Sequence, residues 1–310
     1  RCQPQADGCI DPADPKRACE VTELLGALEA GGTKFRAAVV DPQSMKIEDQ
    51  ILVPTTMPDQ TLAPIIDFFV GHDLAAVGIA SFGPLIVDPE SDSYGCMGST
   101  PKPGWSGAPL LKPIADAVKV PCDIQTDVEA AAVAEYRMGA GQGHRSVAYV
   151  TVGTGVGAAV AIDGVPFRGR DHTELGHMPV RRVEGDNYPG RCPFHGDCLE
   201  GLAAGPAIAD RWQADPVTLA TNDEVWDLEA KYLAQLVRVY AYSFAPDIVL
   251  FGGGVGTRPH LAGRIQAAAL SDLGGYSVSH ADNKSLVATA GLGEDAGLYG
   301  AAYVAAGLVS

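Results

Sequence analysis

Two stretches of this chain follow one pattern: Leu24-Leu-Gly-Ala-Leu-Glu-Ala-Gly-Gly-Thr-Lys-Phe-Arg-Ala-Ala-Val-Val-Asp41 and Ser146-Val-Ala-Tyr-Val-Thr-Val-Gly-Thr-Gly-Val-Gly-Ala-Ala-Val-Ala-Ile-Asp163. In each, an apolar strand enters a bend of glycine and threonine, and a second apolar strand leaves it. This arrangement predicts a β-hairpin with a glycine-rich turn. A hairpin used twice predicts two related halves that face a cleft. The alternative is that any two β-hairpins look alike.

The flanking sequence alternates between strand and helix patterns. Strands are expected at 51–56, 75–81, 122–126 and 247–251, and helices at 61–70, 128–137, 224–244 and 296–308. The helix at 224–244 has apolar residues at three- and four-residue spacing, which is typical of an amphipathic helix. The chain is therefore expected to be an α/β protein, and its length favours about two domains.

Composition excludes several classes of partner. The 310 residues include 22 Lys plus Arg and 38 Asp plus Glu, a net charge of −16, which argues against nucleic acid and anionic membranes. No apolar run is long enough for a membrane helix. The first 23 residues carry three cysteines and three prolines without the apolar core of a secretory signal, so they are expected to form a disordered tail. Seven cysteines, an odd number, favour a reducing cytoplasm over a disulfide framework.

Three glycine turns are candidates for phosphate binding: Gly31-Gly32-Thr33, Gly153-Thr154-Gly155 and Gly252-Gly253-Gly254. Backbone N–H groups and threonine hydroxyls in such turns can surround a polyphosphate without much positive charge. None matches the G-x-x-x-x-G-K-[ST] motif, and none is expected to open a βαβ unit. The alternative for any one of them is a tight turn that needs glycine for its backbone conformation.

Asp127 is the first candidate for a catalytic acid or base. It lies where the strand at 122–126 gives way to the helix at 128–137. The functional interpretation is a general base that takes a proton from an attacking sugar hydroxyl while charge stabilisation carries most of the rate of phosphoryl transfer. The alternative is that Asp127 only caps the helix.

A metal-ligand pattern follows in Glu174-Leu-Gly-His177 and Cys192-Pro-Phe-His195-Gly-Asp-Cys198-Leu-Glu200. Two cysteines and two histidines can complete a tetrahedral zinc shell, and four protein ligands leave no position for water, so the zinc would be structural. Catalytic or binding groups are then sought beside it, first among Glu174 and Glu200. The alternatives are buried cysteines and surface histidines without a metal, or His172 in place of His177 as a ligand.

These motifs resemble the ROK proteins (repressors, open reading frames and sugar kinases), and most closely the zinc-containing bacterial fructokinases. The motifs that carry the resemblance are Ala30–Lys34, Ser81–Pro84, Thr100-Pro-Lys-Pro-Gly-Trp105, Thr126-Asp127, Gly153–Gly155, Glu174–His177, Cys192–Gly201 and Gly252–Gly254, in the family's order. The resemblance implies an actin-like ATPase (ribonuclease H-like) fold with two related α/β domains around a central cleft. It implies a first domain at 24–126, with the helix at about 296–310 packed back on it, and a second at 127–295.

The resemblance also implies residue roles. Asp127 would be the catalytic base, and Glu174 and Glu200 would bind sugar hydroxyls. Phosphate or nucleotide contacts fall on Gly32, Thr33, Lys34, Thr154, Gly155, Pro206, Gly253 and Gly254, and the zinc ligands on His177, Cys192, His195 and Cys198. The sequence departs from many relatives at Glu129, where they carry asparagine. Glutamate accepts hydrogen bonds but cannot donate them, so the sugar contacts near this position are in question.

The expected activity is ATP-dependent phosphorylation of a hexose with Mg2+ and a structural Zn2+, most simply of fructose to fructose 6-phosphate. Glucose, mannose or an N-acetylhexosamine is the alternative acceptor, and a sugar-sensing protein without catalysis is a third hypothesis. The expected partners are the hexose and ATP, and not nucleic acid or a membrane. The sequence is compatible with a homodimer but does not set the oligomeric state.

Overall fold

The first half of the chain forms a mixed five-stranded sheet in the order β3-β2-β1-β4-β5. The computed structural model describes residues 23–219, 221–276 and 285–309, so the tail expected at 1–23 lies outside the described residues except for its last one. The strands are β1 Leu24–Ala30, β2 Lys34–Val40, β3 Ile47–Pro54, β4 Leu74–Ser81 and β5 Cys122–Thr126. Within this sheet β1 runs antiparallel to β2 and parallel to β4.

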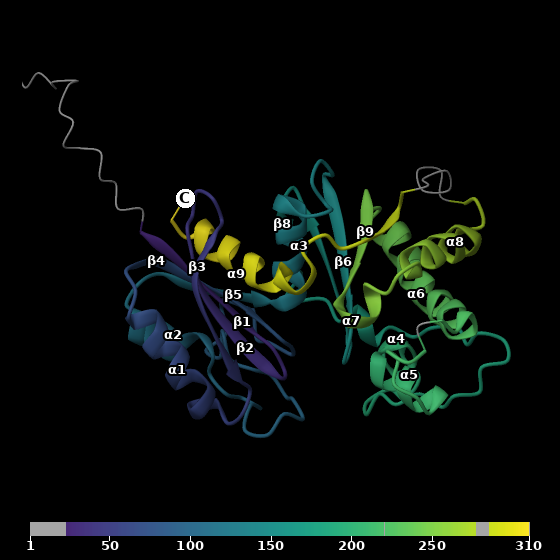
Figure 1. The fold of residues 1–310 in the computed structure, drawn as a ribbon, viewed down its shortest axis with the longest axis horizontal. Coiled ribbons are helices and arrows are strands. Elements are labelled where there is room, and N and C mark those ends of the chain that lie inside the picture. Colours follow the sequence, from purple (N-terminus) through teal and green to yellow (C-terminus); the bar gives the residue numbers. More distant parts are fainter. Residues whose placement is uncertain (1–22, 220, 277–284, 310) are drawn as a thin grey trace, which may run out of the picture.

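The second half repeats this topology. Its strands are β6 Ser146–Val152, β7 Val156–Ile162, β8 Val165–Pro166, β9 Ile248–Gly252 and β10 Val287–Thr289. Their order, β8-β7-β6-β9-β10, has the same connectivity as the first sheet, with β6 antiparallel to β7 and parallel to β9. The predicted duplication of a glycine hairpin is confirmed as two related α/β halves, which lie side by side in Figure 1.

Helices cover both sheets. They are α1 Pro58–Val70, α2 Leu111–Val118, α3 Asp127–Met138, α4 Leu199–Ala203, α5 Gly205–Trp212, α6 Asp223–Ser243, α7 Gly253–Gly256, α8 Leu261–Leu273 and α9 Ala296–Gly307, with short 3-10 turns η2 Leu175–His177 and η3 Gly293–Asp295. Residues of α1 and α2, such as Ile65 and Ile114, join one core with the first sheet. Residues of α6 and α8, such as Leu233 and Ile265, join another core with the second sheet.

Helices α3 and α9 lie between the two sheets (Figure 1). Helix α9 packs on β1 and β4, α3 packs on β6 and β7, and the two helices pack on each other. Glycine makes the crossing possible, because a Cβ at Gly300 would lie 2.2 Å from the carbonyl oxygen of Ala130 on α3. A Cβ at Gly78 on β4 would lie 2.0 Å from the carbonyl oxygen of Ala301. The halves are therefore joined through a closely packed pair of helices.

The central strands are apolar because both of their faces are covered. In β6, Val150 belongs to the core under α6 and α8, whereas Val147 and Tyr149 face the core under α3. Strands buried on both faces appear in sequence as continuous apolar runs. This explains why the hairpins could be located to within a residue or two.

One topological expectation is wrong. The turn Gly252–Gly254 does open a βαβ crossover, since β9 leads through α7 and α8 to the parallel strand β10. The crossover was missed because β10 has three residues, too short a run to be seen as a strand in sequence. Among the described residues, no helix combines the length and the apolar character that crossing a membrane requires.

Candidate active site

Asp127 is the first residue of α3 and lies at the end of β5. The N-cap of this helix is the preceding residue, Thr126, whose hydroxyl oxygen accepts the Glu129 N–H at 3.3 Å. Glu129 completes a capping box by accepting the Thr126 N–H at 3.1 Å. The cap that was the alternative role for Asp127 is therefore supplied by its neighbour. The Asp127 carboxylate accepts the Val128 N–H at 2.8 Å, and backbone N–H groups are the donors described for it.

The protein surroundings of Asp127 stabilise its protonated, neutral form relative to the same carboxyl group in water. Burial raises the pKa of Asp127 to about 6; the nearby Glu174 carboxylate adds to the rise, and His172 opposes it. His172 lies 3.4 Å from Glu174 through Nδ1, and its Nε2 accepts the Leu85 N–H at 3.3 Å. The loop after β8 thus brings Glu174 and His172 toward the base. A carboxyl group with a pKa near neutrality is suited to proton transfer.

Glu129 is fully engaged in structure. Its side chain is 2% exposed and forms a two-point ion pair with Arg168, at 2.8 Å from Nε to Oε1 and 2.9 Å from Nη2 to Oε2. Its Oε2 also accepts the Thr126 hydroxyl at 2.9 Å. Both carboxylate oxygens are therefore occupied by partners in the chain. Where many relatives carry asparagine, this chain therefore has a glutamate whose carboxylate is paired with Arg168.

In the first glycine turn, the Gly31 N–H donates to the Lys34 carbonyl at 3.0 Å, whereas the N–H groups of Gly32 and Thr33 have no such partner among the described residues. The Gly31 carbonyl accepts the Thr55 hydroxyl at 2.8 Å, the Thr33 carbonyl accepts the Thr55 N–H at 3.0 Å, and the Gly32 carbonyl accepts the Lys102 ammonium. Within the part of the chain that the structure describes, no acceptor faces the N–H groups of Gly32 and Thr33. Free N–H groups in a glycine turn form a concave site for an anion.

The second and third turns meet in the other half. The Gly205 N–H at the start of α5 donates to the Gly153 carbonyl at 2.8 Å, which places Pro206 beside the second turn. The third turn approaches the same strand end, since a Cβ at Gly253 would lie 2.5 Å from the Val152 carbonyl oxygen. The residues expected to contact nucleotide, Thr154, Gly155, Pro206, Gly253 and Gly254, therefore gather at this end of the second sheet.

Glu200 lies against the second turn. Its Oε2 accepts the Val156 N–H at 3.0 Å, and a Cβ at Gly155 would lie 2.6 Å from the same oxygen. Its Oε1 is 4.0 Å from Nδ1 of His177. A larger residue at 155 would therefore displace the Glu200 carboxylate from this position. Glu200 connects the second turn with the cysteine and histidine cluster.

That cluster consists of His177, Cys192, His195 and Cys198, whose ligand atoms all lie within 4.8 Å of one another. Nδ1 of His177 is 3.6 Å from each sulfur, and Nδ1 of His195 is 3.7 Å from the Cys192 sulfur. In a tetrahedral site with Zn–S near 2.3 Å and Zn–N near 2.0 Å, neighbouring S and N ligands lie about 3.5 Å apart. The donor set and its spacing fit zinc. His172 lies outside the cluster, beside Glu174.

Glu29 on β1 is a site residue that the sequence reasoning missed. Burial raises the pKa of Glu29 to about 7; the Asp127 carboxylate adds to the rise, while Arg36 and Lys34 oppose it. The two acids are therefore near neighbours across the junction of β1 and α3. A signal was present in the sequence, because Glu29 is an acid in an otherwise apolar strand, two residues before Gly31 of the first glycine turn.

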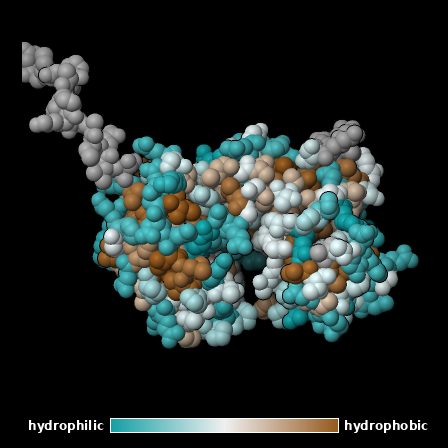
Figure 2. Space-filling view, in the orientation of Figure 1, coloured by the Kyte–Doolittle hydropathy of each residue, from teal (hydrophilic) through white to brown (hydrophobic). Residues whose placement is uncertain are grey.

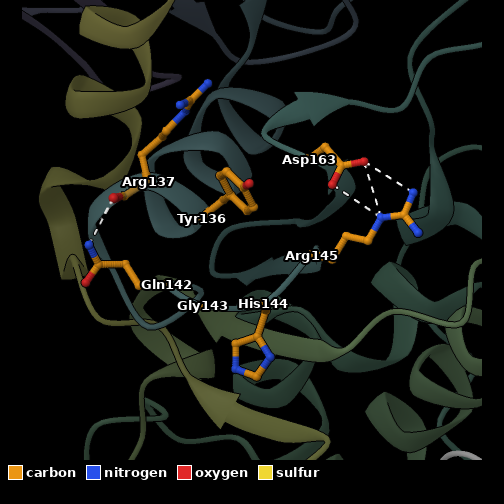
Figure 3. A pocket seen from close by; sticks show the side chains of 7 residues that line it. All are labelled: Tyr136, Arg137, Gln142, Gly143, His144, Arg145 and Asp163. Carbon is orange, nitrogen blue, oxygen red and sulfur yellow. Dashed lines mark hydrogen bonds and ion pairs between the residues drawn. The ribbon is translucent and has the colours of Figure 1, made fainter.

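The space-filling view shows a hollow between the two halves (Figure 2). A separate pocket of ≈ 530 Å³ lies at the other end of α3, lined by Tyr136, Arg137, Gln142, Gly143, His144, Arg145 and Asp163 (Figure 3). Its arginine at 145 is already paired with Asp163 at 3.3 Å. This pocket contains none of the predicted site residues.

The fold and the site define a class of protein. Two related halves of the actin-like ATPase fold each present a glycine turn, and an acid with a raised pKa begins the helix between them. The sequence matches the ROK family over residues 25–307. The chain belongs to the ROK family.

Individual relatives agree with this assignment. The chain is 40% identical over 278 residues to the fructokinase of Pediococcus pentosaceus, with 89% of this chain and 96% of the relative covered. Its structure is similar to that of the ROK hexokinase from Thermus thermophilus, with a TM-score of 0.74, 27% identity and coverage of 91% and 97%. It is also similar to a ROK family glucokinase from Streptomyces griseus solved in complex with glucose and AMPPNP, with a TM-score of 0.67, 26% identity and coverage of 91% and 99%.

Proposed function

We propose that this protein is an ATP-dependent hexose kinase that converts fructose to fructose 6-phosphate. The observation that carries the proposal is the position of Asp127, an acid with a raised pKa at the junction of two halves that each hold a phosphate-type turn. The fructokinase of Pediococcus pentosaceus, which is similar to this chain over 96% of its own length, supports fructose as the acceptor.

Asp127 acts as the general base. Its carboxylate orients the sugar hydroxyl and accepts the hydroxyl proton as the oxygen attacks the terminal phosphorus of ATP. The N–H groups of Gly32 and Thr33 hold phosphate oxygens from the first half, and those of Thr154 and Gly155 do so from the second. Pro206, Gly253 and Gly254 contact the nucleotide at the strand end where the second and third turns meet.

Two metals belong to the proposal. The Glu29 carboxylate would provide a hard oxygen ligand of the kind that Mg2+ prefers, and Mg2+ bound with ATP would neutralise phosphate charge. Zinc would be held by His177, Cys192, His195 and Cys198 and would fix the segment that carries Glu200. Glu174 and Glu200 then accept hydrogen bonds from sugar hydroxyls.

The test is an assay of purified protein with ATP, Mg2+ and a panel of fructose, glucose, mannose and N-acetylhexosamines, with coupled detection of ADP. We expect the highest kcat/KM for fructose. Asp127→Asn should lower kcat by at least about 100-fold, because the amide cannot accept the proton. Asp116→Asn, which changes an exposed acid of α2, is the matched control and should retain parental turnover.

Two other outcomes are defined by the same assay. A preference for glucose would favour the glucokinase alternative, which the likeness to the Streptomyces griseus enzyme supports. Hexose binding without ATP consumption by the parental protein would reject the kinase and favour a sugar sensor. Turnover of Asp127→Asn at the parental rate would show that Asp127 is not the general base.

A further inference from the structure

Lys102 belongs to the motif Thr100-Pro-Lys-Pro-Gly-Trp105, to which the proposed reaction gives no role. Its ammonium donates to the carbonyl oxygen of Gly32, the central residue of the first phosphate turn. The contact joins residues 70 positions apart in the chain. The motif therefore extends from the loop after β4 onto the phosphate turn.

The position of Lys102 is fixed by its neighbour Trp105. The indole of Trp105 is completely buried, its Nε1–H donates to the Thr56 carbonyl at 2.7 Å, and its ring packs on Phe35 at 5.1 Å between centroids. Phe35 follows the phosphate turn directly at the start of β2. The same core residues thus hold both the turn and the segment that carries the lysine.

The charge balance around the turn singles out Lys102. The two other cations beside the turn have carboxylate partners: Lys34 pairs with Glu294 at 3.5 Å, and Arg36 pairs with Asp295. Lys102 is half-buried, and among residues 23–219, 221–276 and 285–309 no carboxylate lies within ion-pair distance of it. The described partner of the Lys102 ammonium is a neutral carbonyl, so its charge is not neutralised by an acid of the chain. The position favours the arrival of an anion.

The free N–H groups of Gly32 and Thr33 lie in the same turn as the carbonyl that Lys102 contacts. A phosphate bound to those N–H groups therefore comes within reach of a flexible ammonium. We propose that Lys102 is a catalytic residue whose ammonium leaves the Gly32 carbonyl for a non-bridging oxygen of the terminal phosphoryl group of ATP. This proposal rests on the proposed kinase function.

The role of Lys102 is electrostatic. During transfer, a bond forms between the sugar oxygen and phosphorus, and the bond between phosphorus and the bridging oxygen of ADP breaks. The hydroxyl proton goes to Asp127, and Lys102 takes no part in the proton transfer. Its positive charge stabilises the negative charge on the three equatorial oxygens of the phosphoryl group. Such electrostatic stabilisation is a main source of rate acceleration in phosphoryl transfer.

The experiment compares Lys102→Met, Lys102→Arg and Lys112→Met in the full-length protein. Methionine keeps the length and the apolar stem of lysine but removes the charge, and Lys112→Met removes an exposed charge of α2 in the same half. We expect Lys102→Met to lower kcat about 100-fold while KM for the hexose changes less than about threefold. Lys102→Arg should recover part of the loss, and Lys112→Met should match the parental enzyme.

Binding of MgADP with aluminium fluoride and hexose, which mimics the phosphoryl group in flight, separates this role from a structural one. Lys102→Met should weaken binding of the mimic by a similar factor and leave binding of MgADP alone unchanged. Near-parental kcat in Lys102→Met, or a rise in the KM for hexose alone, would overturn the proposal while leaving the kinase intact. A parental protein that phosphorylates no hexose would instead reject the proposed function.

Discussion

Asp127 and Glu129, two acids of α3, differ in how many of their carboxylate oxygens are already occupied by partners in the chain. Glu129 accepts the Thr126 N–H and hydroxyl and both donors of Arg168, so neither of its oxygens is available. Asp127 accepts backbone N–H groups, including that of Val128, has no cation of its own like Arg168 among its described contacts, and lies near a second acid. Glu129 fixes the start of the helix, and Asp127 can receive a proton. The chemistry thus depends on the contacts of a side chain more than on its type.

The raised pKa of Asp127 predicts the pH dependence of the reaction. A base must be deprotonated to act, so kcat/KM should fall about tenfold per pH unit below about pH 6, the pKa that burial gives to Asp127. Because the Glu174 carboxylate raises this pKa, Glu174→Gln should move the acid limb to lower pH. The measurement is a profile of kcat/KM from pH 4.5 to 8.5.

Circular dichroism at each pH, and recovery of activity after return to pH 7.5, separate titration of the base from unfolding. Glu184→Gln, which changes an exposed acid of the same half, should leave the acid limb unmoved. A flat profile down to pH 4.5 would be incompatible with Asp127 as the titrating base.

Asp127, the acid that begins α3, could be identified from the sequence, but the residues that act through contacts with distant parts of the chain could not. Asp127 stood out because a strand pattern ends and a helix pattern begins beside it. The partner of Glu129 lies 39 residues away, and the carbonyl that Lys102 contacts lies 70 residues away. Such pairs are set by the fold of the loops and leave no periodic signal.

At the scale of elements, the segment from His177 to Cys198 has little regular structure of its own. Its described backbone contacts include the pair between Cys192 and Gly196, whose N–H groups donate to each other's carbonyl groups at 3.1 and 2.9 Å. A segment with so few ladder bonds needs another source of order, and the proposed zinc would supply it. Helix α4 follows Cys198 directly and carries Glu200, whose carboxylate contacts the second glycine turn. An ordered segment therefore helps to position that turn.

Removal of zinc should therefore loosen this segment and lower activity indirectly. We expect about one zinc ion per chain by elemental analysis, and an earlier thermal transition after treatment with a strong chelator, because zinc-binding free energy is also folding free energy. Cys198→Ser should lose the ion, melt earlier, and show no further response to chelator.

Cys96→Ser is the matched control, since Cys96 is a free thiol outside the cluster and should keep the zinc content and melting temperature. Equal melting curves with and without chelator, in protein that contains no zinc, would refute the metal site.

The hairpins and the longest helix could be predicted from the sequence, whereas most short elements and the 13-residue helix α8 could not. The hairpins β1 with β2 and β6 with β7, and the long helix α6, were located because burial on one or both faces produces a strong pattern. Helices α2, α4, α5 and α8 and strands β8 and β10 were not predicted. Several of these have five residues or fewer, such as Leu199–Ala203, and their stability comes from the core they join.

For the whole molecule, the crossing of α3 and α9 sets how closely the halves approach. Gly300 touches the backbone of Ala130 on α3, and the carboxylate of Glu135 on the same helix accepts the N–H groups of Gly291 and Leu292, just before α9. These contacts join the two helices at two separate points. The position of the halves therefore depends on small residues and on one buried acid.

Gly300→Ala should act on this crossing. An added methyl group would lie 2.2 Å from the Ala130 carbonyl oxygen, so the helices must separate. We expect the free energy of unfolding in urea to fall by about 1 to 3 kcal/mol. Gly307→Ala in the same helix, where a Cβ meets no atom within 4 Å, should be close to neutral. A Gly300→Ala protein as stable as Gly307→Ala would show that the close contact at the crossing does not limit stability.

The duplication was visible in the sequence because each half begins with the same eighteen-residue pattern. The arrangement of the halves was not visible, because it depends on which glycines meet which carbonyl groups across the crossing.

The Asp127 carboxylate, the proposed base, lies at the junction of the two halves. Strand β5, which ends at Thr126, is part of the first sheet, whereas α3, which begins at Asp127, leans on the second. Rotation of one lobe against the other must therefore turn the base as well as move the phosphate turns. Under the proposed function, we expect a bound sugar to draw the lobes together and bring base and nucleotide into register, so that hydrolysis of ATP without a sugar would be slow.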